Sequence, residues 1–167
     1  HRGCIPTKAL LHSAEVADTT KEAGNFGVQA TFQGIDMTAV NKYRDSIVDK
    51  LYKGLTGLVG HAKNITFVQG EGRLAGPKTV TVGADQYTGK NVILATGSVT
   101  KTLGIEITGR VITSDQALLM DWIPNRVAIL GGGVIGVEFA SVWRSFGSEV
   151  VIIEGLDRLV PNEDPSM

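Results

Sequence analysis

The chain has 167 residues, of which 43% are apolar, so its composition supports a sizeable core and excludes an intrinsically disordered protein. Its 16 basic and 17 acidic residues give a net charge of −1 without a basic block, which argues against a surface for nucleic acid or an anionic membrane. No apolar stretch approaches the roughly 20 residues that cross a bilayer. The single cysteine excludes a disulfide within the chain and favours the cytoplasm or an organelle matrix.

Two helices are predicted in the first third of the chain. The first has Pro6 in its first turn and runs to about Gly24, because proline suits a helix start and glycine a helix end. A loop rich in Gly and Gln follows, through Gly34. The second helix has apolar residues at spacings of three and four, namely Val40, Tyr43, Ile47, Val48, Leu51, Leu55, Leu58 and Val59. Three glycines lie in its last turns, so the sequence does not define the residue at which this helix ends.

Short β-branched runs follow, separated by Gly, Pro and Asp, and this pattern predicts a small β-meander with tight turns. The runs are Ile65–Val68, a stretch around Arg73 and Leu74, Thr79–Val82 and Asn91–Leu94. The last run ends in the turn formed by Ala95, Thr96 and Gly97. Beyond this sheet, one short helix is expected around Asp115 to Met120.

The last third of the chain predicts a complete strand–helix–strand unit. Val127–Leu130 is an uninterrupted apolar run, typical of a strand buried in a parallel sheet. A glycine-rich loop follows, then a helix from about Ile135 to Phe146 that Gly147 ends. Val150–Ile153 is the second strand and leads directly into Glu154. The fold class is therefore α/β.

The glycine-rich loop has the pattern Gly-x-Gly-x-x-Gly, which binds dinucleotides when it joins a strand to a helix. Gly131 permits a tight turn, Gly133 lets a pyrophosphate approach the backbone, and Gly136 lets the helix pack closely on the strand. The helix amino end at Val134 and Ile135 offers unpaired N–H groups to the phosphates. The adenosine half of FAD and an ordinary glycine turn remain alternatives.

Glu154 bears on which dinucleotide this loop takes. It lies 18 residues beyond Gly136, at the end of the next strand. A carboxylate there can accept a hydrogen bond from a ribose 2′-hydroxyl and repels a 2′-phosphate. NAD is therefore favoured over NADP, and the nearby Arg158 tempers that preference only slightly.

Cys4 lies beside the start of the first helix. The thiolate is the reactive form of cysteine, and a helix amino terminus stabilises it. Lys8 adds a positive charge one turn further on. This setting suits a nucleophile or redox thiol, although a single cysteine without further context is more often inert.

Three segments resemble dihydrolipoamide dehydrogenases, within the flavoprotein disulfide oxidoreductase family. They are the run from Gly3 to Leu11, the turn at Ala95–Ser98 and the segment from Gly131 to Gly147, and Leu159–Pro161 adds a shorter match. The resemblance spans nearly the whole chain in the family's order. It implies part of an FAD-binding domain with its β-meander over 1–110, joined to the first half of a Rossmann-type NAD-binding domain over 111–167.

The resemblance also implies site roles. Cys4 would be the flavin-side thiol of a redox pair whose partner falls two residues before His1. Lys8 would lie near the flavin and pair with Glu138, so that Cys4, Lys8 and Glu138 form the catalytic set. Ala95, Thr96 and Gly97 would approach FAD through their backbone. His12 and His61 are expected to be surface or packing residues, and Trp122 and Trp143 are expected to be packing residues.

The activity that this resemblance implies is reoxidation of dihydrolipoamide through a disulfide and FAD, with a hydride passed to NAD⁺. The substrate would be carried on the lipoyl domain of a 2-oxo acid dehydrogenase complex, and the full-length protein would be a homodimer. We expect the 167 residues to be an internal piece, inactive alone, because the FAD fingerprint, the exchange thiol and a His–Glu pair lie outside them. A mercuric or glutathione reductase and a non-catalytic dinucleotide-binding remnant are the alternatives.

Overall fold

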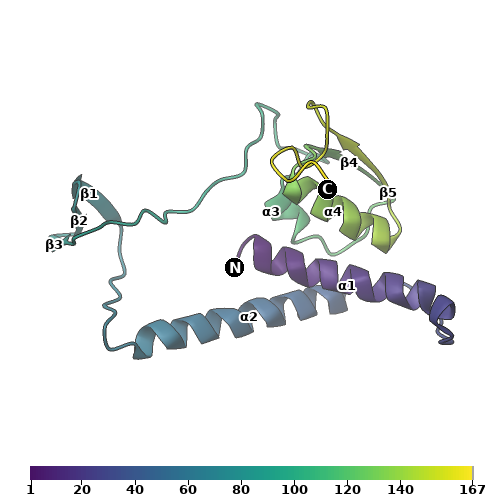
Figure 1. Ribbon diagram of the computed structural model, residues 1–167, viewed down its shortest axis with the longest axis horizontal. Coiled ribbons are helices and arrows are strands. Elements are labelled where there is room, and N and C mark those ends of the chain that lie inside the picture. The colour runs from purple at the N-terminus through teal and green to yellow at the C-terminus, as the bar shows by residue number, and fades with distance from the viewer. Residues whose placement is uncertain (167) are drawn as a thin grey trace. The chain divides into compact units, whose positions relative to one another are not determined.

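The computed structural model describes residues 1–166 and divides into two compact units (Figure 1). The larger unit combines His1–Tyr52 with the chain from Thr102 onward, and the smaller unit is Lys53–Lys101. Helix α2 runs from one unit into the other. Among the described residues, no helix is both long enough and apolar enough to cross a membrane.

Helix α1 (Cys4–Glu22) opens the larger unit. Cys4 is its first residue and Pro6 its third, so Pro6 lies in the first turn, as predicted. Proline is tolerated there because the first four N–H groups of a helix have no partner within it. A 3₁₀ turn, Ala23–Phe26, extends the helix, and Gly27 rather than Gly24 adopts the left-handed conformation, at φ +74°.

Helix α2 (Met37–His61) is longer than its apolar pattern predicted. Asp36 caps its start, because its carboxylate accepts the N–H groups of Thr38 at 2.9 Å and Ala39 at 3.2 Å. The three glycines near its end do not interrupt the helix. Of its residues, Met37 and Arg44 are buried, whereas Leu51, Leu55 and Leu58 are exposed.

The smaller unit contains an antiparallel sheet in the order β1 (Gly72–Gly76), β2 (Thr79–Val82), β3 (Asp85–Thr88). The sequence predicted a meander here but missed β3, whose residues are polar and exposed. The predicted strands Ile65–Val68 and Asn91–Leu94 were wrong. Their residues favour extended backbone, but neither run pairs with another strand within residues 1–166. A residue's β propensity cannot form a β-strand without a neighbouring strand to accept and donate the hydrogen bonds.

The predicted strand–helix–strand unit is present in the larger unit. Strand β4 (Arg126–Leu130) pairs in parallel with β5 (Glu149–Ile153), and α4 (Val134–Phe146) connects them. Gly147 ends α4 at φ +105°, donating its N–H to the Arg144 carbonyl, as the glycine predicted. Helix α3 (Ser114–Ala117) is shorter than expected and starts in a Thr113–Gln116 capping box.

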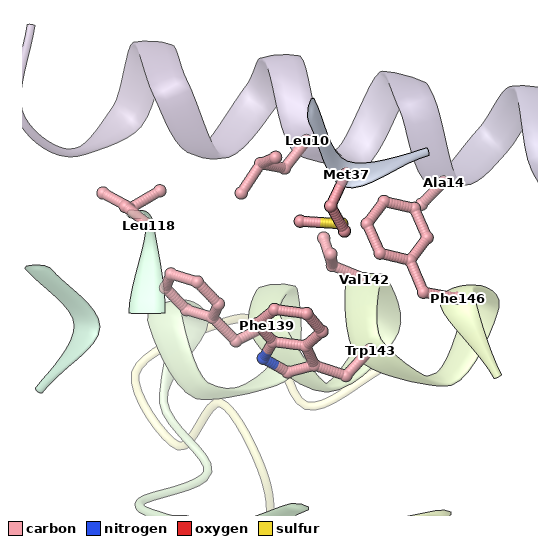
Figure 2. Close-up of a cluster of buried hydrophobic side chains, with 8 residues drawn as sticks. All are labelled: Leu10, Ala14, Met37, Leu118, Phe139, Val142, Trp143 and Phe146. Carbon is pink, nitrogen blue, oxygen red and sulfur yellow. The ribbon is translucent and has the colours of Figure 1, made fainter. Parts of the chain in front are cut away.

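One core joins α1, α4 and their neighbours. Helices α1 and α4 pack against each other along their length (Figure 1). Figure 2 shows aromatic side chains of α4 facing the apolar face of α1. The buried cluster consists of Leu10, Ala14, Met37, Leu118, Phe139, Val142, Trp143 and Phe146. The expected packing role of Trp143 is confirmed, whereas Trp122 is exposed.

Candidate functional site

The glycine loop between β4 and α4 depends on two glycines for its shape. Gly131 lies at φ +107°, a conformation that side chains rarely adopt, and donates its N–H to the Ile153 carbonyl at 2.8 Å. A Cβ on Gly136 would lie 2.0 Å from the Gly131 carbonyl oxygen. The loop therefore closes on itself only because both residues lack a side chain.

Gly133 behaves differently from these two residues. Its φ is −71°, which any residue adopts, and a Cβ there would meet no described atom within 4 Å. Nothing in the fold requires glycine at this position. The open space borders the amino end of α4, where the first N–H groups have no partner within the helix. Because this helix end offers hydrogen-bond donors and a positive dipole, it is where the chain could hold a pyrophosphate.

The Glu154 carboxylate lies against the same loop. One oxygen accepts the Gly132 N–H at 2.6 Å, and the other accepts those of Gly155 at 2.7 Å and Leu156 at 2.9 Å. These bonds, the one from Gly132 foremost, lower the pKa of Glu154 below its ordinary value of 4.5. The residue therefore stays charged and ties the loop to the end of β5. The sequence placed Glu154 correctly but did not predict its contact with Gly132.

Cys4 is free and exposed at the first position of α1. Beside it, α1 and α2 form an open groove of about 300 Å³ lined by Cys4, Ile5, Lys8, Ala9, Tyr43, Ile47 and Leu51. The wall from α2 consists of Tyr43, Ile47 and Leu51, spaced four residues apart on one helix face. The sequence analysis used these three residues only as evidence for a helix, and their spacing alone could not show that they border a thiol.

Lys8 and Glu138 meet between α1 and α4. The Lys8 ammonium donates a hydrogen bond to a Glu138 carboxylate oxygen, although 130 residues separate them in sequence. The Glu138 side chain is only 18% exposed, and that of Lys8 is 57% exposed. The hydrogen bond and charge of Glu138 raise the pKa of Lys8 above 10.5. The fold thus fixes a cation one helical turn from the thiol.

The residues predicted to contact FAD through their backbone belong to the smaller unit. Ala95, Thr96 and Gly97 lie in an irregular, exposed segment, and Gly97 adopts a left-handed φ of +87°. Their proposed backbone contacts with FAD stay a prediction. His12 and His61 are exposed, which agrees with a surface role. Each donates a hydrogen bond from Nδ1 within its own helix, His12 to the Glu15 carboxylate and His61 to the Gly57 carbonyl.

Comparison with known proteins places this geometry in a family. A family model described as pyridine nucleotide-disulphide oxidoreductase matches residues 1–167. The chain is 41% identical to a dihydrolipoyl dehydrogenase of Bacillus subtilis, covering 98% of this chain and 38% of the relative. It is 39% identical to a chloroplastic dihydrolipoyl dehydrogenase 2 of Arabidopsis thaliana, covering 100% and 30%.

Solved structures agree with the sequence matches. The HOCl-induced flavoprotein disulfide reductase RclA from Escherichia coli, in a Cu(II) complex, superposes with a TM-score of 0.75 at 28% identity, over 99% of this chain and 35% of that one. The chain thus spans about a third of the length of the proteins it matches. These findings confirm the predicted α/β fold and the resemblance to flavin- and pyridine nucleotide-dependent oxidoreductases. The chain belongs to the pyridine nucleotide-disulphide oxidoreductase family.

Proposed function

We propose that this chain is part of a dihydrolipoamide dehydrogenase that uses FAD and NAD. One observation carries the proposal: the helix that begins with Cys4 is joined through Lys8 to Glu138 on the helix that follows the glycine loop. A redox thiol and a dinucleotide loop are thereby held in one rigid arrangement. The identity of 41% to a dihydrolipoyl dehydrogenase supports the choice of substrate.

The domain boundary and assembly belong to the same proposal. Residues 1–110 form part of an FAD-binding domain and residues 111–167 the first part of an NAD-binding domain. The full-length protein acts as a homodimer on dihydrolipoamide carried by the lipoyl domain of a 2-oxo acid dehydrogenase complex. Its compartment is the cytoplasm or an organelle matrix, in line with the single exposed cysteine.

In this function Cys4 works with an exchange thiol outside the 167 residues. The substrate dithiol is oxidised to a disulfide while the enzyme disulfide, which includes the Cys4 sulfur, is reduced to two thiols. Reoxidation of the two enzyme thiols to the disulfide would release two electrons and two protons. Bound FAD would supply the two-electron acceptor, and both electrons would pass with one proton to NAD⁺ as a hydride. Lys8, held by Glu138, supplies positive charge that stabilises the thiolate and the reduced flavin beside it.

The glycine loop holds NAD in this proposal. The N–H groups at the start of α4, from Gly133 through Val134 and Ile135, receive the pyrophosphate, while Gly131 and Gly136 maintain the turn. Glu154 keeps its charge at neutral pH and excludes a 2′-phosphate. The pyrophosphate occupies the open space beside Gly133, where a side chain would otherwise lie.

The test uses the full-length protein loaded with FAD. We expect NAD⁺ reduction with dihydrolipoamide, and we expect Cys4→Ser to lower this turnover by about 10³-fold or more, because the thiolate is lost. NADH binding should persist in Cys4→Ser, which separates chemistry from folding. Turnover that survives the substitution would contradict the proposal, and so would lipoamide-dependent turnover by the isolated 167 residues, which lack the other thiol.

A second candidate is a disulfide reductase with another substrate, favoured by the structural similarity to RclA. Assays of the same protein with NADPH and oxidised glutathione or Hg²⁺ distinguish this candidate. Activity in these assays without lipoamide turnover would select it. A non-catalytic remnant would bind NADH and fail every assay.

A further inference from the structure

The chain beyond β5 folds back onto the glycine loop. We call residues 158–164 the strap. Within it, Val160 donates its N–H to the Gly132 carbonyl at 2.7 Å, and the Leu159 side chain lies 2.4 Å from where a Cβ on Gly132 would stand. Glu154 already accepts the Gly132 N–H. Both backbone polar groups of Gly132, in the centre of the glycine loop, are therefore bound by the segment that follows β5.

Arg158 holds the strap in this shape. Its Nη2 atom donates to the carbonyls of Val160 at 3.2 Å, Glu163 at 2.8 Å and Asp164 at 3.1 Å, and the side chain is half-buried. These charge-assisted hydrogen bonds connect three backbone carbonyls of the strap to one side chain. They also oppose the strain at Val160, which lies at φ +43°, a conformation that a β-branched residue rarely adopts.

We propose that Arg158 is a positioning residue for dinucleotide binding. It closes the strap on Gly132 and so keeps the N–H groups at the start of α4 aimed at the pyrophosphate, without touching the ligand. The Nη2 donors of Arg158 are committed to these three carbonyls, so in this proposal the discrimination against NADP rests on Glu154. This inference rests on the proposed use of NAD.

The experiment measures NADH and NADPH binding by calorimetry in the full-length, FAD-loaded protein. We expect Arg158→Gln to raise the Kd for NADH about tenfold, the effect of one lost charge-assisted hydrogen bond. The Kd for NADPH should rise by the same factor, leaving their ratio unchanged. The KM for NAD⁺ should rise more than kcat falls. Arg158→Lys, which keeps the charge without the fork, should lie between wild type and Arg158→Gln.

A matched control is Arg126→Gln, which removes the same charge from an exposed position at the start of β4 and should leave both affinities unchanged. An unchanged Kd for NADH in Arg158→Gln, even with a lower melting temperature, would overturn the proposal, because the arginine would then be merely structural. A loss confined to NADPH would also overturn it, by making Arg158 a phosphate ligand.

If Arg158→Gln does not fold, Leu159→Ala decides the question. It trims the contact between strap and Gly132 and leaves the arginine in place, so a weaker affinity for NADH supports the strap's role and an unchanged affinity overturns it. A wild-type protein that binds neither dinucleotide overturns the proposed function together with this inference. Wild-type binding that every strap variant retains overturns the inference alone.

Discussion

At the scale of single residues, the glycine loop separates structural glycines from those that leave room for a ligand. Gly136 has no space for a side chain because the Gly131 carbonyl lies against it, whereas Gly133 borders open space with an ordinary φ. Both positions fit the same sequence pattern. Only the geometry distinguishes what each glycine does.

The first prediction compares alanine at these two positions in the full-length protein. We expect Gly136→Ala to lower the free energy of unfolding by about 2–3 kcal/mol, because the new methyl group clashes with backbone. Gly133→Ala should leave the stability unchanged and weaken NADH binding, because its methyl group occupies the pyrophosphate space. Denaturant unfolding and NADH titration measure the two effects. Equal losses of stability in both variants would contradict this division.

The second prediction concerns acid and Glu154. Its pKa is lower in the folded protein than its ordinary value of 4.5, because it accepts backbone hydrogen bonds from Gly132, Leu156 and Gly155. The stability that it contributes is therefore fully present above pH 4.5 and is lost as the pH falls through the lower, folded value. We expect Glu154→Gln to be less stable than wild type at neutral pH, with the difference shrinking in acid. A melting-temperature difference that is constant with pH would rule this out.

At the scale of elements, α2 is docked by polar groups as well as by its apolar residues. Arg44, 6% exposed, donates to the Leu118 carbonyl after α3 and to Asn41 at 2.8 Å. Asn41 in turn donates to the Met120 carbonyl at 3.0 Å. These bonds satisfy carbonyls at the end of a short helix, where no intrahelical donors remain. The apolar pattern of α2 gave no indication of this contact.

The third prediction follows from that docking. We expect Arg44→Ala to lower the free energy of unfolding by about 2–3 kcal/mol, because it leaves the buried Leu118 carbonyl without a donor. Lys42→Ala, on an exposed face of the same helix, is the control and should change the stability by about 0.5 kcal/mol or less. Denaturant unfolding of the full-length protein measures both. If Arg44→Ala lowered the free energy of unfolding as little as Lys42→Ala does, the hydrogen bonds of Arg44 would contribute nothing to stability.

The sequence predicted those elements whose determinants are local in the chain, and it contained no local signal for the contacts between distant residues. The unit from β4 to β5 was predicted almost residue by residue, because an apolar run, a glycine turn and a helix stop all agree there. Ile65–Val68 and Asn91–Leu94 were wrong because a strand depends on a neighbour that propensity cannot supply. The pairing of Lys8 with Glu138, 130 residues away, came from the family resemblance and from nothing local. The strap contact of Val160 had no signal at all.

At the scale of the molecule, the larger unit has one core that two distant stretches of chain build together. Val142 lies at its centre with no exposed surface, and the same buried cluster joins Leu10 and Ala14 from α1 to Phe146 from α4 (Figure 2). Asp18 adds a polar contact at the same interface, because its carboxylate accepts the Ser145 hydroxyl. Helices α1 and α4 therefore stabilise each other.

The fourth prediction tests this shared stability. We expect Val142→Ala to cost about 2 kcal/mol, since it opens a cavity between α1 and α4. Val111→Ala, the same substitution at a 45% exposed site, should cost about 0.5 kcal/mol or less. Hydrogen exchange followed by mass spectrometry should show that α1 and α4 lose protection together in Val142→Ala. Loss confined to α4 would mean that the helices open independently.

The contact between α1 and α4 also constrains how the sequence can evolve. The proposed boundary near residue 110 separates two nucleotide-binding domains along the chain, yet the Leu10–Ala14 face of one is completed by Val142 and Phe146 of the other. A dinucleotide domain exchanged between relatives would arrive with a mismatched surface for α1. Residues on these two helix faces should consequently covary between relatives. A change of nucleotide preference should instead arise from substitutions at Glu154 and its neighbours, while α4 keeps its apolar face.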